Sequence, residues 1–150
     1  MSLKQQIEQE LLDAMRTKDE IRRNTLRMVI AAVKLFEVEK TKSTIDDAAL
    51  LAIIQKEIKT RRDSLVEFEK GKRQDLIETT NNEIAVLEKY LPRQLSSTEV
   101  EAIVKQSIAE VGATSPADMG KVMKVVLPKI AGQAPSDIVS KVVRSLLSQE

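Results

Sequence analysis

Two side chains that often do chemistry in proteins, those of cysteine and histidine, are missing from this sequence. There is no cysteine, which excludes disulfides, thiolate zinc sites and thiol nucleophiles. There is no histidine either, so the usual general base and the commonest metal ligand are both absent. The sequence therefore points to no catalytic residue, no metal site and no cofactor, and the search for function turns to segments that contain glycine, lysine and arginine.

A glycine–lysine segment at residues 118–123 is the first candidate for a binding site. It reads Asp-Met-Gly-Lys-Val-Met, which is not the usual pattern of a glycine-rich phosphate loop. Gly120 lies where a helix is expected, and glycine there costs about 1 kcal/mol of helix propensity relative to alanine. We infer that Gly120 permits a close approach, either by another helix of the same subdomain or by a ligand backbone such as RNA.

The second candidate is the turn at residues 128–135, which reads Pro-Lys-Ile-Ala-Gly-Gln-Ala-Pro. Lys129 and Gln133 lie close to its glycine. The segment is either a tight connection between two helices or, together with Lys121 and Lys124, part of a surface that binds a ligand.

The third candidate is a basic series on an expected helix near the middle of the chain. Its members are Lys56, Lys59, Arg61 and Arg62, with Arg22, Arg23, Arg27 and Lys34 on the helix before it. They form either a solvated helix face or, through Lys56, Lys59 and Arg62, a secondary basic face for a binding partner.

Arg61 differs from these neighbours, because it belongs to the apolar side of the same helix. At 100° per residue it falls about 20° from Ile54. An unpaired buried charge is very costly, so a cation at this position must reach the surface or meet a carboxylate. We expect a structural Arg61 paired with Glu57 one turn earlier, with Glu83 or Glu88 as the alternatives.

Composition bounds what the whole chain can do. Its 150 residues carry 24 basic and 23 acidic side chains, a formal charge of +1. A protein that held nucleic acid alone through many phosphate contacts would be distinctly basic, so any such binding must be local or shared with a partner. No apolar run approaches 18 residues and no apolar signal segment opens the chain, which predicts a cytoplasmic protein without membrane contact.

Apolar residues recur every three to four positions throughout the chain, which predicts an all-α protein. Four helices are expected first, with Asp46 as the cap of the third and Gly71 as its left-handed stop. Three shorter helices follow: one capped by Ser96, one opened by Pro116, and one that begins after Pro135.

Pro92 marks the boundary between the two sets of helices. It has no amide hydrogen and disfavours the helical conformation at Leu91, so the fourth helix should end at or just before that residue. We predict a helical amino-terminal subdomain over residues 1–92 and a three-helix carboxy-terminal subdomain over residues 96–150, joined by a short proline-containing linker.

Three sets of residues together resemble the signature of YqeY-like proteins. They are Tyr-Leu-Pro-Arg-Gln-Leu-Ser at 90–96, Asp-Met-Gly-Lys-Val-Met at 118–123, and Pro128-Lys129 with Gly132 and Ala134. These proteins are stand-alone relatives of the carboxy-terminal tail of the GatB subunit of the tRNA-dependent amidotransferase. The family often has Ala-Asp-Gly after the glycine turn, whereas here Pro135 and Ser136 follow Ala134.

The resemblance implies an all-α, non-catalytic module associated with tRNA or with a tRNA-linked enzyme. Its RNA-binding set would be Lys121, Lys124, Lys129 and Gln133, which would meet phosphates without reading bases. A label such as carbon–nitrogen ligase with glutamine as amido-N-donor would attach by family association alone. The alternative function is a protein-interaction adaptor whose helical grooves accept a partner helix.

Overall fold

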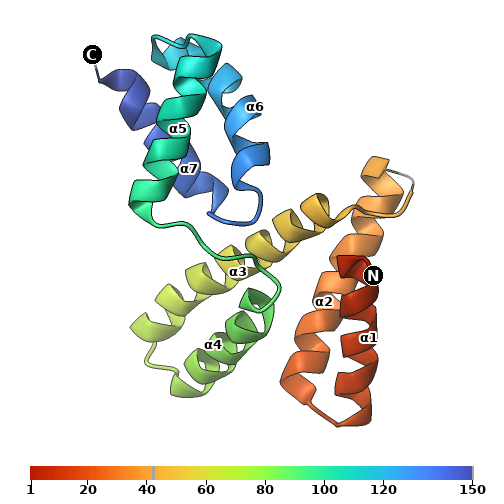
Figure 1. Cartoon of the computed structure of the whole chain (residues 1–150). Helices are drawn as coiled ribbons and strands as arrows, with labels where there is room; N and C mark the ends of the chain where they lie inside the picture. Colours follow the sequence, from red (N-terminus) through yellow and green to blue (C-terminus); the bar gives the residue numbers. More distant parts are fainter. Residues whose placement is uncertain (42, 150) are drawn as a thin grey trace. The chain divides into compact units, whose positions relative to one another are not determined.

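The computed structural model describes residues 1–41 and 43–149 of the chain. Over these residues the backbone forms seven α-helices and no strand, so the prediction of an all-α protein is confirmed (Figure 1). The helices are α1 (Leu3–Arg16), α2 (Glu20–Phe36), α3 (Asp47–Lys70), α4 (Gln74–Glu88), α5 (Ser97–Val111), α6 (Met119–Ile130) and α7 (Ser136–Ser148). A π-helical turn, η1 (Glu37–Thr41), follows α2, and a 3₁₀ turn, η2 (Pro116–Asp118), precedes α6.

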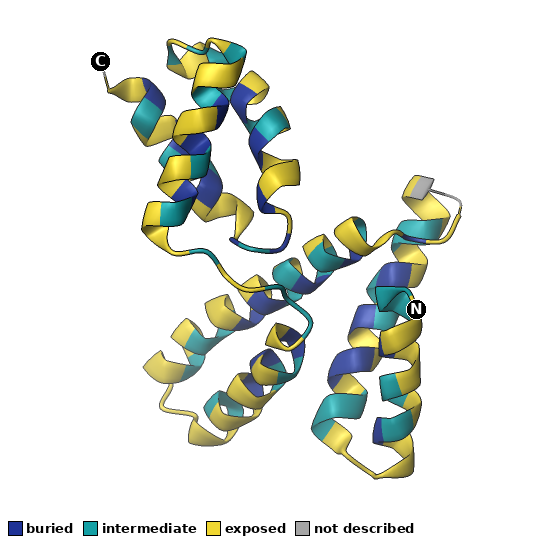
Figure 2. Cartoon of the chain, viewed as in Figure 1, coloured by how far each residue is buried: buried dark blue, intermediate teal, exposed yellow. Residues whose placement is uncertain are grey.

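The chain divides into two compact units, which we call the amino-terminal unit (Met1–Leu91) and the carboxy-terminal unit (Pro92–Glu150). Two helical hairpins build the first: α1 lies beside α2, and α3 beside α4 (Figure 1). Each helix buries one stripe of apolar side chains, visible in Figure 2 as dark segments along one side of the ribbon. These stripes, together with Ile45 from the segment before α3, form one core: Ile7, Leu26, Val29, Val33, Ile45, Leu50, Ile54, Ile58, Ile84 and Leu87.

Local capping explains where α3 begins and how it ends. The Asp46 side chain accepts a hydrogen bond from the Ala49 amide at 2.8 Å, so the predicted cap is confirmed. The prediction of a left-handed conformation at Gly71 is wrong, because Gly71 has φ of −84° and Lys72 has φ of 53°. The left-handed residue after α3 is therefore Lys72, one residue later than the preference of glycine for positive φ predicts.

The carboxy-terminal unit is a three-helix bundle with its own core. Ser96 and Glu99 form the predicted capping box at the start of α5, and Gly112 closes that helix with φ of 66°. Pro116 opens the 3₁₀ turn, and α6 itself begins at Met119 and continues through Pro128 to Ile130. The core consists of Val100, Val104, Val122, Val126, Ile130, Ala134, Val139, Val143 and Leu147.

Residues 92–95 lie within the carboxy-terminal unit and are held by hydrogen bonds to the turn between α6 and α7. The Gln94 side-chain amide donates to the Gly132 carbonyl at 2.8 Å, and the Leu95 amide donates to the Gln133 carbonyl at 2.9 Å. The α4 helix itself ends at Glu88, ahead of Leu91. The segment that follows Pro92 is therefore an ordered part of the bundle.

Candidate nucleic-acid interface

The exposed side of α6 presents two lysines and a glycine. Lys121 leaves 72% of its side chain accessible, and its nearest carboxylate oxygen, from Asp118, is 3.8 Å away. Lys124 lies one turn further along, is exposed, and forms no ion pair with any residue that the structure describes. Because residues three apart are neighbours on a helix surface, the two ammonium groups belong to one face.

Gly120 lies beside these lysines and is exposed. A Cβ atom built at this position would meet nothing within 4 Å. The interpretation that a neighbouring helix of the subdomain requires the glycine is therefore wrong for the described part of the chain. The packing of the described residues therefore does not require a glycine at this position.

Asp118 organises the entrance to α6. Its carboxylate accepts a hydrogen bond from the Thr114 amide at 2.9 Å. This bond is the main reason that the pKa of Asp118 lies below its ordinary value, so the side chain is ionised near neutral pH. The negative charge holds the loop before α6 and partly offsets the charge of Lys121.

Lys129 and Gln133, the other two members of the expected RNA-binding set, are engaged within the bundle. The Lys129 ammonium forms an ion pair with Glu110 at 2.8 Å and donates to the buried Ser107 hydroxyl at 3.3 Å. The Gln133 side-chain amide donates to the Arg93 carbonyl at 3.3 Å. Both side chains have structural partners, whereas Lys121 and Lys124 remain the more available cations of the set.

Two further cations were not singled out from the sequence. Lys141 and Arg144 of α7 are exposed, and neither forms an ion pair with a described residue. Spacing alone could have found them, because both belong to the polar side of a helix whose apolar stripe is regular. They add positive charge to a unit whose other arginine, Arg93, is paired with Glu99 at 2.8 Å.

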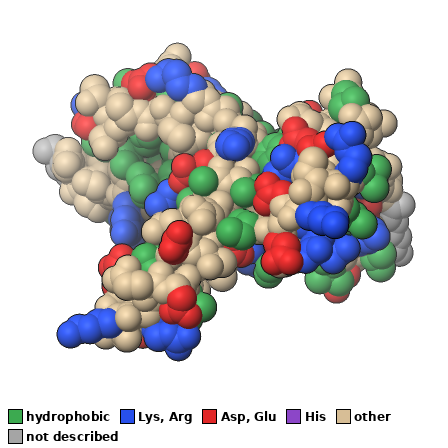
Figure 3. All heavy atoms as spheres, turned by 90° about the horizontal axis from the view of Figure 1, so that it is seen from below, with side chains coloured by type: hydrophobic (Ala, Val, Ile, Leu, Met, Phe, Trp, Pro, Cys, Tyr) green, Lys and Arg blue, Asp and Glu red, His purple; other side chains and the backbone are tan. Residues whose placement is uncertain are grey.

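The expected secondary basic face is largely neutralised by neighbouring carboxylates. Lys59 pairs with Asp63 at 3.2 Å, and Arg62 pairs with Glu88 of α4. Lys56 is exposed and has no such partner among the described residues. Acidic and basic side chains also lie intermingled on the face shown in Figure 3. A surface of mixed sign attracts a polyanion weakly.

Arg61 is the one cation of this series that is buried, as its place in the apolar stripe predicts. It is 7% exposed and lies 3.1 Å from the Glu57 carboxylate and 3.5 Å from that of Glu83. The predicted pairing with Glu57 is confirmed, and Glu83 of α4 is a second partner. Arg61 therefore ties α3 to α4 and is unavailable to a ligand.

Comparison with known proteins assigns the family. The sequence pattern of the family described as Yqey-like protein matches residues 4–147. The chain belongs to the Yqey-like family. This match confirms the resemblance drawn from the motifs at 90–96 and 118–123, and it covers both units.

Two fungal relatives are similar to this Yqey-like chain over most of its length. A protein of Kluyveromyces lactis is 34% identical over 144 residues, which cover 91% of this chain and 77% of the relative. A protein of Pyrenophora tritici-repentis is 33% identical over 148 residues, covering 94% and 78% respectively. Both bear the name "Altered inheritance of mitochondria protein 41, mitochondrial".

These names correct one expectation from the sequence. The relatives are named as mitochondrial proteins, so the prediction of a cytoplasmic location is wrong. The physical reason is that a cysteine-free chain of balanced charge fits more than one reducing compartment, and its composition does not discriminate between them. No helix within residues 1–41 and 43–149 combines the length and apolarity that crossing a membrane requires.

Proposed function

We propose that this Yqey-like chain is a non-catalytic module that binds the backbone of RNA, with tRNA as the expected ligand, through the exposed side of α6. The observation that supports the proposal most directly is the open space over Gly120, which lies beside the exposed Lys121 and Lys124 on α6. A glycine lets a bulky backbone come close to the helix. Two lysines beside it supply the charges that a phosphate backbone needs.

The chemistry of the site favours backbone contacts over base reading. The chain has one tyrosine, two phenylalanines and no tryptophan, so it offers few rings on which bases could stack. The available cations are Lys121 and Lys124 on α6, with Lys141 and Arg144 on α7 as two more. So few charges predict weak binding that is sensitive to salt, because each phosphate that is neutralised releases counterions. Such a module would position RNA for a partner enzyme and would carry out no reaction itself.

Fluorescence anisotropy of labelled bulk tRNA, titrated with the protein over a series of salt concentrations, tests the proposal. We expect saturable binding at low salt that weakens as salt rises. The double substitution Lys121→Ala and Lys124→Ala should reduce the slope of log affinity against log salt by about two. No binding at low salt, or an unchanged slope in the double variant, would refute an RNA site on α6.

A matched control separates local contacts from a general change in charge. Lys70→Ala with Lys105→Ala removes the same two charges from exposed side chains that are paired with Glu67 and Glu101. This control should bind tRNA with nearly the wild-type salt slope. Equal effects of the two double variants would mean that tRNA responds to net charge and that α6 has no special role.

A further inference from the structure

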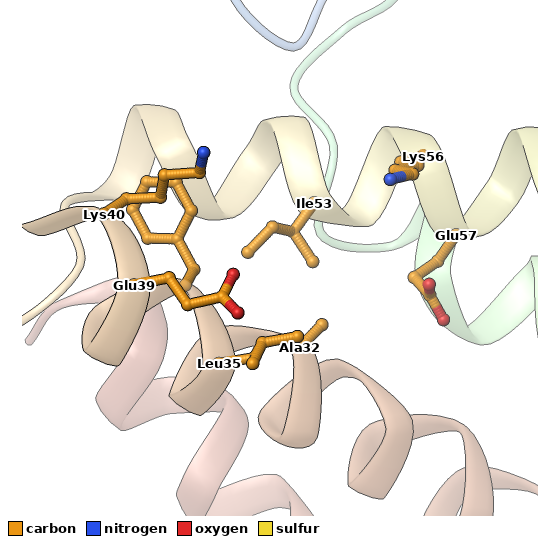
Figure 4. Close-up of a pocket in the computed structure, with 8 residues that line it drawn as sticks. Ala32, Leu35, Glu39, Lys40, Ile53, Lys56 and Glu57 are labelled. Carbon is orange, nitrogen blue, oxygen red and sulfur yellow. The ribbon is translucent and has the colours of Figure 1, made fainter.

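A second surface lies wholly within the amino-terminal unit, between α2, η1 and α3 (Figure 4). It is a hollow of about 230 Å³, which we call the α2–α3 groove. Its centre is apolar, with Ala32 and Leu35 on α2 and Ile53 on α3. Charged side chains stand at both ends in Figure 4, with Lys40 at one end and Lys56 at the other.

The apolar side of the groove continues along α2. Met28, Ala32 and Leu35 are spaced as i, i+4 and i+7, so they form one stripe on the helix surface. Met28 is 53% exposed and Leu35 is 58% exposed, although α2 also has a separate buried stripe that fills the core. A contiguous exposed apolar stripe beside a hollow is typical of an interaction surface.

The dimensions of the stripe limit what can occupy it. From Met28 to Leu35 the α2 helix advances about 10 Å at 1.5 Å per residue. A partner segment that covers this length as a helix needs about two turns, or roughly 7 residues. A side chain at every third or fourth position of that segment would then reach the groove.

The charges at the rim indicate the chemistry of the occupant. Lys40 and Lys56 form no ion pair with any described residue, and Figure 4 shows them on either side of Ile53. Glu57 is already neutralised by Arg61 at 3.1 Å. The unpaired Glu39 stands on the α2 side of the groove. The rim therefore carries two free positive charges, Lys40 on η1 and Lys56 on α3, against the one free negative charge of Glu39. Carboxylates of an occupant would match this positive excess.

We propose that the α2–α3 groove binds an amphipathic helix of another protein, which inserts an apolar ridge against Leu35 and Ile53 and places acidic side chains beside Lys40 and Lys56. RNA fits this surface poorly, because its phosphates would meet Glu39 and gain nothing from an aliphatic floor. A second copy in a twofold arrangement also fits poorly, because like-charged rims and two hollows would face each other.

Selection from a displayed library of helical 14-residue peptides against the full chain tests this inference. Peptides that also bind a Leu35→Lys variant are removed during selection. We expect the enriched sequences to carry apolar residues at i, i+3 or i+4, and i+7, with Asp or Glu along one flank. Enrichment of basic sequences, or no enrichment over the Leu35→Lys variant, would overturn the proposal.

Affinity measurements with the best selected peptide test the groove side chain by side chain. Leu35→Lys should weaken binding at least about tenfold, because the burial of one leucine is lost. Lys56→Glu should also weaken it, and a peptide whose acidic flank is changed to lysine should regain affinity for that variant. Val66→Lys, at another exposed apolar position, is the control and should bind like the wild type. Equal loss in the Val66→Lys control would refute specific binding in the groove.

Light scattering tests the remaining alternative, in which a second copy of this chain occupies the groove. We expect the chain to have the same mass in solution as its Leu35→Lys variant. A dimer that the substitution dissociates would overturn the proposal, because the groove would then be covered by a second copy of this chain.

Discussion

At the scale of single residues, Gly120 is the position where a substitution that should stabilise the fold should also weaken the proposed RNA binding. Its φ lies outside the left-handed region, and a Cβ there would touch nothing within 4 Å. Alanine therefore fits the fold without strain and improves helix propensity. Within the described residues, no packing contact accounts for a glycine at this position.

We expect Gly120→Ala to raise the free energy of unfolding by about 0.5–1 kcal/mol and to weaken tRNA binding. Urea denaturation followed by circular dichroism gives the first quantity, and anisotropy titration gives the second. Ala117→Gly, at an exposed position in the preceding 3₁₀ turn, serves as a control that changes the backbone nearby. A more stable Gly120→Ala variant with unchanged tRNA affinity would show that no ligand approaches this glycine.

Tyr90 links the end of the amino-terminal unit to α1 through a hydrogen bond. Its hydroxyl donates a hydrogen bond to the Glu10 carboxylate, and Arg22 donates to the Glu10 carbonyl at 3.3 Å. Burial, followed by the hydrogen bond to Glu10, raises the pKa of Tyr90 well above its ordinary value.

The ionisation of Tyr90 can be read directly, since it is the single tyrosine of the chain. Because folding favours the protonated form, this contribution to stability is present below the ordinary pKa near 10.0 and is lost as pH rises through the folded pKa. We expect tyrosinate absorbance to appear at a higher pH than in free tyrosine. Glu10→Gln should lower that pH, and an ordinary midpoint in the wild type would contradict the buried contact.

At the scale of helices, capping chemistry was the most predictable feature of the sequence. The caps Asp46 and Ser96 were found from residue type and spacing, because a short polar side chain satisfies amides only two or three residues away. The buried Arg61 was found from periodicity for a similar reason. The two caps and the Arg61–Glu57 pair depend on interactions within one helix or one turn, whereas the contact of Arg61 with Glu83 joins two helices.

Features that depend on tertiary neighbours were not predictable in the same way. The partner of Lys129 is Glu110, which lies 19 residues away on α5, and no local pattern links the two. The groove beside Leu35 depends on where α3 crosses α2. The left-handed residue at Lys72 shows a related limit. The preference of glycine for positive φ predicts where a turn occurs, and packing decides which residue of the turn adopts that conformation.

Glu99 carries the pH dependence of the capping box at α5. The Arg93 guanidinium, together with the Ser96 amide and hydroxyl, lowers the pKa of Glu99 to about 2. A lowered pKa stabilises the folded state above the ordinary value of 4.5, and this contribution is lost as pH falls toward 2. We expect an NMR titration of the Glu99 carboxyl group to give a midpoint near 2.

Substitutions at the same cap provide the control for this titration. Arg93→Ala removes the largest cause of the shift, so the midpoint of Glu99 should move up toward its ordinary value. Helix content of Glu99→Gln should depend less on pH than that of the wild type between pH 4.5 and about 2. A midpoint near 4.5 in the wild type would mean that the capping box is open in solution.

At the scale of the whole molecule, the two units have separate cores, and each core is built from its own helices. The carboxy-terminal unit should therefore fold as a fragment. The position at which the fragment begins matters, because residues 92–95 contribute contacts to the bundle. They supply the bond from Gln94 to Gly132 and the bond from Leu95 to Gln133, and the Leu95 side chain packs against the core.

We expect a fragment of residues 92–150 to fold. A fragment of residues 96–150 should be less stable by roughly 3 kcal/mol, because each lost hydrogen bond costs about 1 kcal/mol and the Leu95 contact is lost as well. Urea denaturation of both fragments measures the difference. Gln94→Ala in the longer fragment should cost about 1 kcal/mol, because it removes one of these bonds. Equal stability of the two fragments would make residues 92–95 a passive connection. A clear difference would explain why the Pro-Arg-Gln-Leu-Ser and Gly-Gln segments occur together in one chain, since each completes the hydrogen bonds of the other.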